Sequence, residues 1–552
     1  MSARLVSSLL ALALTAGVAL HGPCAFAQTG TESSPSAAAA PTPQEPSPAP
    51  PAAADPQVDA AFSATLSERL LREDSRANAR AKEDRAALVM FYGVRQNVPV
   101  WTSSAGLTEA GQALLREFAQ ADDWGLEANA FKIAALSAVE VRFASPAEQA
   151  NAEFDIASQL LKYARYARGG RAEPTSLSRF IDRQLTYVNP QKVLSEISAT
   201  DKPDAYLRSL HPQHPQFEML RQKYLELRGR SLASPAPAKS DKGKKDAKAD
   251  PKPEKGTLKK LLVNMEQWRW MPEDLGATYI NVNVPEYTLR IVKDGKVIHS
   301  ERAIVGKIDK QTPIFSEGMA QVIFNPTWGV PDSIKRNEIY PDLVKGKVRI
   351  LSRNNLKLRQ NGRDVDPESV DWGSADIRKF QVVQPSGDKN VLGVVKFRFP
   401  NKHDVYMHDT PTKKLFDTEV RAYSHGCVRV REPEKFATLL LAADQGWTAA
   451  RVASAIKSNQ ENQTVNLRQK VPVHLTYFTA VVTDDGKLKL FNDVYGHEHR
   501  IAMGMEGKAH TLPREKEEFV KVDVVGSLNE AKPSVSATQH KEEWARRAFQ
   551  QN

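Results

Sequence analysis

The chain has 552 residues, of which 76 are Lys or Arg and 66 are Asp or Glu, so its formal net charge is +10. This length allows about three or four domains with ample hydrophobic cores, and it excludes a single small domain. The positive charge suggests an anionic setting such as an envelope polymer, although solubility alone explains it equally well.

Residues 1–27 have the pattern of a cleaved secretory signal. Arg4 precedes an apolar run from Leu5 to Leu20, and a small-x-small sequence ends at Ala27. The run is shorter than the roughly 20 residues that span a bilayer, and no later stretch reaches that length. The sequence therefore predicts export without a transmembrane anchor after cleavage, and uncleaved anchoring is the alternative.

Only two cysteines are present, Cys24 and Cys427. Cleavage after Ala27 removes Cys24, so the mature protein has one thiol in an oxidising compartment. An intramolecular disulfide is therefore excluded. A lone thiol of this kind is either a small buried hydrophobic group or a chemical reagent.

The segment after the signal, residues 28–56, is rich in Pro, Ala and Ser and is expected to be a flexible tether. Residues 57–230 show helical periodicity. After Thr108, which suits a helix start, apolar residues recur at helical spacing, at Leu114, Leu115 and Phe118. A second helix is expected to end at Gly169 and Gly170. This region gathers no catalytic residue types, so we interpret it as a helical scaffold.

A second linker, residues 231–256, is rich in Lys, Pro and Ala and indicates a solvated spacer. From residue 257 to 506 the pattern is mainly that of β-strands. Asp294-Gly295 is a strong tight-turn signal between two alternating segments. The β pattern after Gln463 is expected to complete the sheet.

Within this region, residues 332–389 form a long polar excursion between two strand-like segments. A connection of that length inside a sheet more often has a function than not, so it is interpreted as an active-site lid. Residues 507–552 are charged and poorly periodic, which indicates a disordered tail.

The segment "HDVYMHDT" alternates apolar and polar residues. A strand here would bury Val405 and Met407 and turn Tyr406 and His408 toward an open face. Sixteen residues after His408 the chain reads "SHGCVRV", with Gly426 directly before the thiol of Cys427. The two segments are therefore candidates for one site.

These residue types suit nucleophilic catalysis. The thiol of Cys427 would attack as a thiolate, and the imidazole of His408 would take its proton. Asp409, or a nearby backbone carbonyl, would orient that imidazole. The amides of Gly426 and Cys427 would face a developing oxyanion, and Arg429 would bind a substrate carboxylate.

Other interpretations of the same residues remain open. A lone Cys is most often a buried small hydrophobic residue, and a strand His is most often a satisfied polar one. A zinc site is a further alternative, since ligand types occur at His403, His408, His425 and Cys427. His403 and His408 are five residues apart, however, which places them on opposite faces of a strand. We therefore expect no metal.

The sequence resembles the L,D-transpeptidases with a YkuD-type catalytic domain. The signature of that family is a His followed by Ser-His-Gly-Cys and a nearby Arg or Asn, and it occurs here as His408 and then "SHGCVR" from Ser424 to Arg429. The stretches "WRWMPEDLG", "FNPTWGVPDSI" and "LGVVKFRFPNKHDVYMHDTP" resemble the large scaffold-bearing Gram-negative branch. That branch usually carries a peptidoglycan-binding module, whose place is held here by the spacer at 231–256.

This resemblance implies an α+β multidomain fold, with a helical scaffold domain and a mainly β catalytic domain that carries a lid. It implies that Cys427 attacks the tetrapeptide stem of peptidoglycan where the third residue joins the terminal D-alanine. His408 would act as base and acid, and the amides of His425, Gly426 and Cys427 would bind the oxyanion. The product would be a 3→3 cross-link, made in the periplasm without cofactor or metal.

The resemblance also implies that four residues position the substrate: Arg429, Tyr406, Ser424 and Trp328. Trp328 would in addition anchor the lid. Carbapenems are expected to acylate Cys427. The expected partners are stem peptides, with a lysine of an outer-membrane protein as an alternative acceptor, and no nucleic acid. Two other functions remain open: an L,D-carboxypeptidase that hydrolyses the same bond, and a non-enzymatic envelope scaffold.

Overall fold

The computed structural model describes residues 58–72, 75, 77–136, 141–233, 255–513 and 515. The expected signal at 1–27 and tether at 28–56 lie outside the described residues, as do nearly all of the spacer and the tail. Within the described ranges, no helix is both long enough and apolar enough to cross a membrane.

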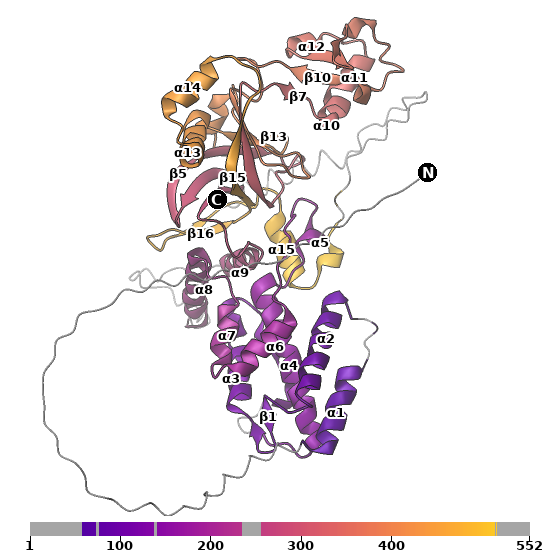
Figure 1. Cartoon of the computed structure of the whole chain (residues 1–552), viewed down its shortest axis with the longest axis vertical. Helices are drawn as coiled ribbons and strands as arrows, with labels where there is room; N and C mark the ends of the chain where they lie inside the picture. Colours follow the sequence, from indigo (N-terminus) through magenta and orange to yellow (C-terminus); the bar gives the residue numbers. More distant parts are fainter. Residues whose placement is uncertain are drawn as a thin grey trace, which may run out of the picture. The chain divides into compact units, whose positions relative to one another are not determined.

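The N-terminal part is helical. Its helices are α1 (Ala60–Leu71), α2 (Ala79–Val94), α3 (Glu109–Ala119), α4 (Pro146–Gly169), α5 (Pro174–Leu177), α6 (Pro190–Ala199), α7 (Pro203–Ser209), α8 (Pro215–Ala233) and α9 (Lys255–Arg269), and one short ribbon pairs β1 (Thr102–Ser103) with β2 (Gly106–Leu107). The expected helical scaffold is therefore present (Figure 1).

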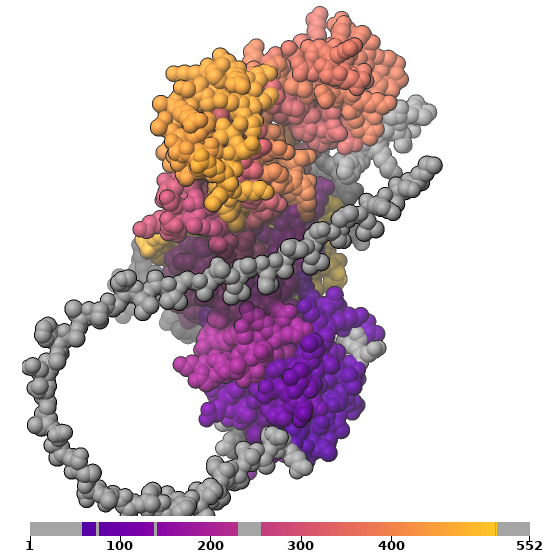
Figure 2. All heavy atoms as spheres, in the orientation of Figure 1, coloured from indigo at the N-terminus to yellow at the C-terminus, as the bar shows by residue number. Residues whose placement is uncertain are grey.

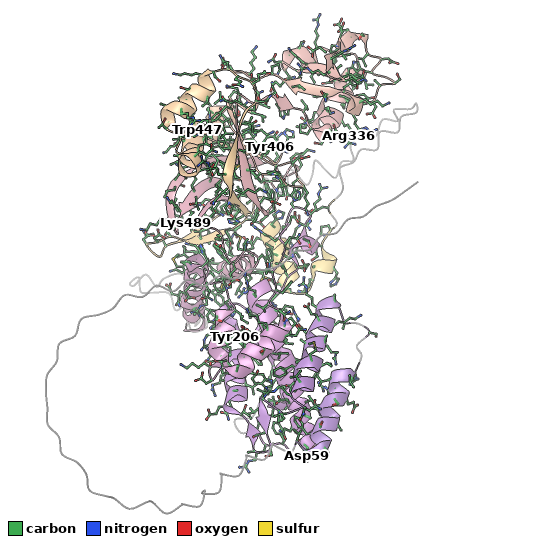
Figure 3. The ribbon with its side chains drawn as sticks, viewed as in Figure 1. Asp59, Tyr206, Arg336, Tyr406, Trp447 and Lys489 are labelled. Atoms are coloured by element: carbon green, nitrogen blue, oxygen red, sulfur yellow. The ribbon has the colours of Figure 1, made fainter. Side chains whose placement is uncertain are left out.

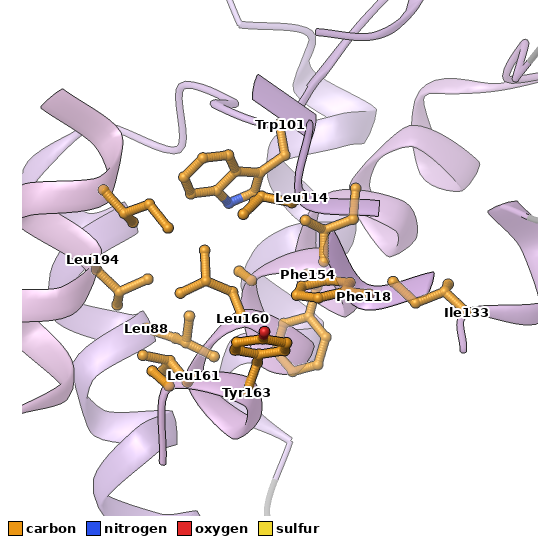
Figure 4. Close-up of a cluster of buried hydrophobic side chains, with 14 of the residues drawn as sticks. Leu88, Trp101, Leu114, Phe118, Ile133, Phe154, Leu160, Leu161, Tyr163 and Leu194 are labelled. Carbon is orange, nitrogen blue, oxygen red and sulfur yellow. The ribbon is translucent and has the colours of Figure 1, made fainter. Parts of the chain in front are cut away.

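Helix α4 forms the centre of the scaffold core. Its residues Phe154, Leu160, Leu161 and Tyr163 are buried against residues of α2, α3 and α6 (Figure 4). The local signals of the sequence act as expected: the side chain of Thr108 accepts the amide of Gly111 and caps α3, and Gly170 ends α4 with φ +81°.

The C-terminal part is built on a sheet of nine strands in the order β13-β5-β14-β12-β11-β6-β15-β3-β4. The strands are β3 (Thr278–Asn283), β4 (Thr288–Lys293), β5 (Lys296–Gly306), β6 (Ser316–Phe324), β11 (Val395–Arg398), β12 (Met407–His408), β13 (Ala422–Ser424), β14 (Val428–Val430) and β15 (Gln463–Thr476). An additional pairing of β4 with β5 joins the last strand back to the second, which closes eight of the strands into a barrel.

The tight turn predicted at Asp294-Gly295 connects β4 to β5. Both residues have positive φ, +49° and +73°, as a two-residue hairpin turn requires. Behind the barrel, α13 (Pro433–Gln445) and α14 (Ala449–Lys457) contribute Phe436, Leu440 and Val452 to the core.

The predicted lid region is a folded insertion with its own sheet, in the order β7-β10-β8-β9. Its elements are β7 (Trp328–Gly329), α10 (Asp332–Ile334), the π-helical turn η4 (Lys335–Ile339), α11 (Tyr340–Val344), α12 (Ile350–Arg353), β8 (Lys357–Gln360), β9 (Arg363–Asp364), η5 (Pro367–Ser369), η6 (Ile377–Lys379) and β10 (Gln381–Gln384). Leu343, Leu351 and Trp372 are buried in a separate apolar cluster. The segment is thus more than a polar excursion, and it appears as a rounded body in Figure 2.

The end of the chain departs from the expected sheet. Strand β15 does enter the barrel, between β6 and β3, but β16 (Ala480–Val482) and β17 (Leu488–Leu490) pair only with each other. Residues of β16 pack with α8 and α9, and α15 (His497–Met505) packs with α9 and α5. The expectation that this whole segment completes the sheet was therefore wrong, because its apolar side chains are buried against helices instead.

Candidate functional site

Three adjacent strands carry the candidate catalytic residues. His408 on β12 is the register partner of Lys396 on β11 and of Arg429 on β14. Register partners point to the same face of a sheet, so these three side chains form one row across the strands. Met407 and Val428, one residue back, are fully buried on the opposite face.

Cys427 and Tyr406 stand two residues before Arg429 and His408, so they lie on the same face as that row. The expected alternation of Met407 with its polar neighbours is therefore present. Tyr406 is labelled in Figure 3, and its ring centroid is 5.7 Å from that of His408. His408 is itself buried, with 5% exposure, rather than open to solvent.

His408 is held by a backbone group. Its Nδ1 lies 2.5 Å from the carbonyl oxygen of Asp409. A carbonyl oxygen can only accept a hydrogen bond, so Nδ1 carries the proton and Nε2 is the basic nitrogen. Burial lowers the pKa of His408 to about 3, and the positive charge of Arg429 contributes in the same direction. The imidazole is therefore neutral at physiological pH.

The carboxylate of Asp409 has other partners. It accepts the ammonium of Lys413 at 2.5 Å and the amide of Val394 at 3.0 Å. A Cβ added at Gly393 would lie 2.1 Å from its Oδ2, so only glycine leaves room for this carboxylate. Of the two groups considered to orient His408, the backbone carbonyl of Asp409 contacts the imidazole, and the carboxylate of Asp409 does not.

The Cys427 thiol is partly buried, and its sulfur lies 3.9 Å from the carbonyl oxygen of Asp404. Burial raises the pKa of the Cys427 thiol, while hydrogen bonds from Tyr406 and the positive charges of Lys396 and Arg429 act in the opposite direction. Burial also raises the pKa of Tyr406 well above its usual range. The resting site is therefore a neutral thiol beside a neutral imidazole.

The loop before the thiol is braced by hydroxyl groups. Ser424 Oγ donates to the carbonyl of Cys427 at 2.5 Å and accepts the amide of Gly426 at 3.1 Å. Thr312 Oγ1 donates to the carbonyl of Gly426 at 2.8 Å. Gly426 has φ +113°, a conformation that L side chains rarely adopt.

This bracing changes the expected oxyanion donors. The amide of Gly426 is already bound to Ser424, so its predicted oxyanion role does not fit this arrangement. Within the described residues, the hydrogen bonds leave the amides of His425 and Cys427 without an acceptor. Ser424 is buried, and both hydrogen bonds of its hydroxyl are made within the loop.

The lid reaches the same loop. His425 Nε2 lies 2.8 Å from Glu338 Oε1 on η4, and both side chains are partly exposed. Trp328 lies on β7 at the base of the lid sheet and packs against the apolar cluster of the lid.

Arg429 retains binding capacity. Its Nη1 donates to Thr412 Oγ1 at 3.3 Å, and its Nε is buried without a partner. Burial lowers the pKa of Arg429 from its usual value.

The histidines considered for zinc have separate partners. His403 Nε2 lies 2.8 Å from Asp182 Oδ2, whereas His408 and His425 bind Asp409 and Glu338. Among the residues that the structure describes, no group of three or more His, Cys, Asp or Glu side chains is arranged to hold a metal ion.

Sequence reasoning missed Lys396, Thr312 and Glu338. Lys396 alternates with buried residues and resembles a solvent-facing strand lysine. Only its register pairing with His408 identifies it as a residue of the site. Thr312 and Glu338 lie 115 and 89 residues before Cys427 and meet the loop only in the folded chain. The sequence carries no local signal for either contact.

Comparison with known proteins agrees with these features. Residues 86–223 match the Scaffold domain family, and residues 277–453 match the L,D-transpeptidase catalytic domain family, YkuD. A curated relative from Haemophilus influenzae, a putative L,D-transpeptidase, is 28% identical over 422 residues, which cover 75% of this chain and 78% of the relative.

Solved structures give a weaker likeness. An L,D-transpeptidase from Mycobacterium smegmatis is 13% identical, with a TM-score of 0.18, over 36% of this chain and 58% of that one. L,D-transpeptidase 1 of Mycobacterium tuberculosis is 13% identical, with a TM-score of 0.16, over 36% of this chain and 61% of that one. This chain thus spans about three fifths of the length of these two solved proteins.

The two family matches leave residues 224–276 between them, the region that contains the Lys-rich spacer. The helical region and the β-rich region coincide with the two matched domains. The chain therefore combines a Scaffold domain with an L,D-transpeptidase catalytic domain of the YkuD type.

Proposed function

We propose that the protein is a periplasmic L,D-transpeptidase that forms 3→3 cross-links in peptidoglycan through a thioester on Cys427. The observation that carries this proposal is the common face of His408 on β12 and Cys427 directly before the adjacent strand β14, next to a loop with free amides. The catalytic family of the domain supports the reaction class.

In the first half of the reaction, His408 Nε2 takes the thiol proton as Cys427 attacks the carbonyl of the third stem residue. A neutral thiol and a neutral imidazole suit this order, because the proton moves only when the substrate arrives. The amides of His425 and Cys427 bind the oxyanion. The C–N bond then breaks, the proton passes from His408 to the departing D-alanine amine, and a thioester remains.

In the second half, the side-chain amine of another stem attacks the thioester carbonyl. An amide bond forms, the C–S bond breaks, and His408 moves the amine proton to the departing sulfur. Water in place of the amine gives hydrolysis at the same site, which is the carboxypeptidase alternative. A lysine of an outer-membrane protein is a further acceptor with the same chemistry.

The test is mass spectrometry of muropeptides after incubating the signal-cleaved protein with tetrapeptide stems. We expect cross-linked dimers and free D-alanine from the wild type, and neither from Cys427→Ser, because a hydroxyl has a much higher pKa than a thiol. Tripeptide without dimers would instead assign hydrolysis. Wild-type activity in Cys427→Ser would overturn the catalytic assignment.

A further inference from the structure

The site contains two cations that have no ion-pair partner among the described residues. Lys396 and Arg429 flank His408 in one row, on β11 and β14. In the part of the chain that the structure describes, neither side chain forms an ion pair with a carboxylate. The carboxylate of Asp404 acts on Lys396 only from beyond ion-pair distance, so one carboxylate faces two cations. The net positive charge beside the thiol favours an anionic ligand.

The position of Lys396 is fixed by an aromatic ring. Its Nζ lies 3.9 Å from the centroid of Tyr406, the residue that also contacts Cys427. The side chain is partly buried, and burial lowers the pKa of Lys396 from its usual value. A long lysine side chain on a strand usually extends into solvent. Here it lies over the ring and beside the dyad.

The reaction chemistry indicates which anion belongs there. This step rests on the proposed function, in which His408 gives its proton to the departing amine. In an amino acid the carboxylate is one carbon away from that nitrogen. A carboxylate on the departing residue must therefore lie close to His408, where Lys396 and Arg429 are its immediate neighbours.

We propose that Lys396, together with Arg429, binds the free C-terminal carboxylate of the residue that leaves, and so selects donors that end one residue beyond the attacked carbonyl. A pentapeptide stem has an uncharged amide at that position, so it loses these ionic contacts. The two cations thus distinguish a tetrapeptide donor from a pentapeptide donor by the charge at this position.

The experiment compares two synthetic donors, a tetrapeptide with a free C-terminal carboxylate and the same peptide with a C-terminal amide. Kinetics of acyl-enzyme formation give kcat/KM for each, in the wild type, Lys396→Met and Lys396→Arg. We expect the wild type to prefer the acid by about tenfold or more, since ionic hydrogen bonds discriminate by roughly that factor. Lys396→Met lowers the ratio by about tenfold, and Lys396→Arg retains most of it.

Arg398 provides the matched control. It lies two residues along β11 on the same face, is exposed, and donates to Gln321 Oε1 at 3.2 Å. Arg398→Met removes the same charge from the same strand and should leave the acid-to-amide ratio unchanged. Thermal unfolding and alkylation of Cys427 confirm that each variant is folded.

The outcomes separate this inference from the proposed function. If the wild type releases neither D-alanine from the acid donor nor D-alaninamide from the amide donor, the proposed function fails. If it turns over both donors with an acid-to-amide ratio of kcat/KM near one, the proposed carboxylate selection is wrong although the proposed reaction is supported. The wild type alone is sufficient to show this. A clear wild-type preference that persists unchanged in folded Lys396→Met would remove Lys396 from the assignment.

Discussion

At the scale of single residues, the site depends on protonation states that burial controls. Burial lowers the pKa of His408 and raises the pKa of the Cys427 thiol, so both groups are neutral near pH 7. This differs from cysteine enzymes that rest as a thiolate beside an imidazolium. The difference can be measured in the free protein.

The pH dependence of alkylation tests this neutral state. Because the thiol pKa is raised, the thiolate fraction at pH 7 is below that of an ordinary cysteine, and it grows only as pH rises past the ordinary thiol range. We expect the rate of Cys427 with iodoacetamide to rise continuously up to about pH 9. A plateau already reached at or below neutral pH would indicate a preformed thiolate.

The backbone at Gly426 provides a second prediction at this scale. Gly426→Ala places a side chain at φ +113° with its Cβ 3.3 Å from the carbonyl oxygen of Gln311. We expect a loss of about 1–3 kcal/mol in stability and a fall in acylation rate of about tenfold or more, because the loop carries the proposed oxyanion amides.

Gly387 is the control for that strain. It has φ +121° and no atom within 4 Å of an added Cβ, and it lies beyond the lid sheet. Gly387→Ala should therefore cost a similar backbone strain and leave acylation unchanged. Equal acylation rates in Gly426→Ala and the wild type, measured as D-alanine release, would show that the loop conformation is not critical.

Local signals in the sequence predicted part of the site. Alternation in one short segment was sufficient to place Tyr406 and His408 on the same face, and Gly426 next to the thiol indicated a turn. Register could not be predicted, because it depends on which strands are neighbours. For that reason Lys396 was missed, and the orienting group of His408 was left open between Asp409 and a carbonyl.

At the scale of elements, the hairpin turn at Asp294-Gly295 and the caps of α3 and α4 were predicted, since each depends on two or three adjacent residues. The closure of the barrel by β4 and β5 and the separate core of the lid depend on contacts between distant residues. The lid therefore looked like a polar excursion in the sequence. Its apolar residues are spread over short elements without one clear period.

The separate core of the lid predicts that it can be removed without unfolding the barrel. The amide of Val330 donates to the carbonyl of Val382 at 2.8 Å, so these residues form the last pair at the base of the lid. Replacing residues 331–381 by Asn-Gly should close a two-residue hairpin there. We expect tetrapeptide cross-linking to fall by about tenfold or more, with iodoacetamide alkylation of Cys427 within about twofold of wild type.

The single substitution Glu338→Gln is the control for this deletion. It removes the carboxylate that contacts His425 and keeps the rest of the lid. A partly exposed pair contributes little, so its effect should be about threefold or less. Unchanged tetrapeptide turnover after lid deletion would show that the lid does not enclose the donor, even with Cys427 as nucleophile.

At the scale of the whole molecule, the scaffold and catalytic regions share buried contacts. The segment around Arg183 pairs with the barrel: the amide of Ile314 donates to the carbonyl of Phe180 at 2.7 Å, and the Arg183 guanidinium donates to the carbonyl of Leu475 at 2.6 Å and to Ser316 Oγ. Apolar clusters also combine α8 and α9 with β16. These contacts make separate folding of the two regions unfavourable.

This coupling predicts one unfolding transition. Arg183 is 4% exposed, and burial lowers its pKa to about 9. Arg183→Met leaves the buried carbonyl of Leu475 without this donor, whereas Ser316 Oγ keeps its contact with His474. We expect a loss of about 2–4 kcal/mol and a fall of about 2–4 °C in the midpoint of a single calorimetric transition. Arg179→Met, which removes an exposed guanidinium four residues earlier, should leave the midpoint unchanged. Two transitions in the wild type, with only one of them shifted by Arg183→Met, would mean that the scaffold unfolds independently of the catalytic domain.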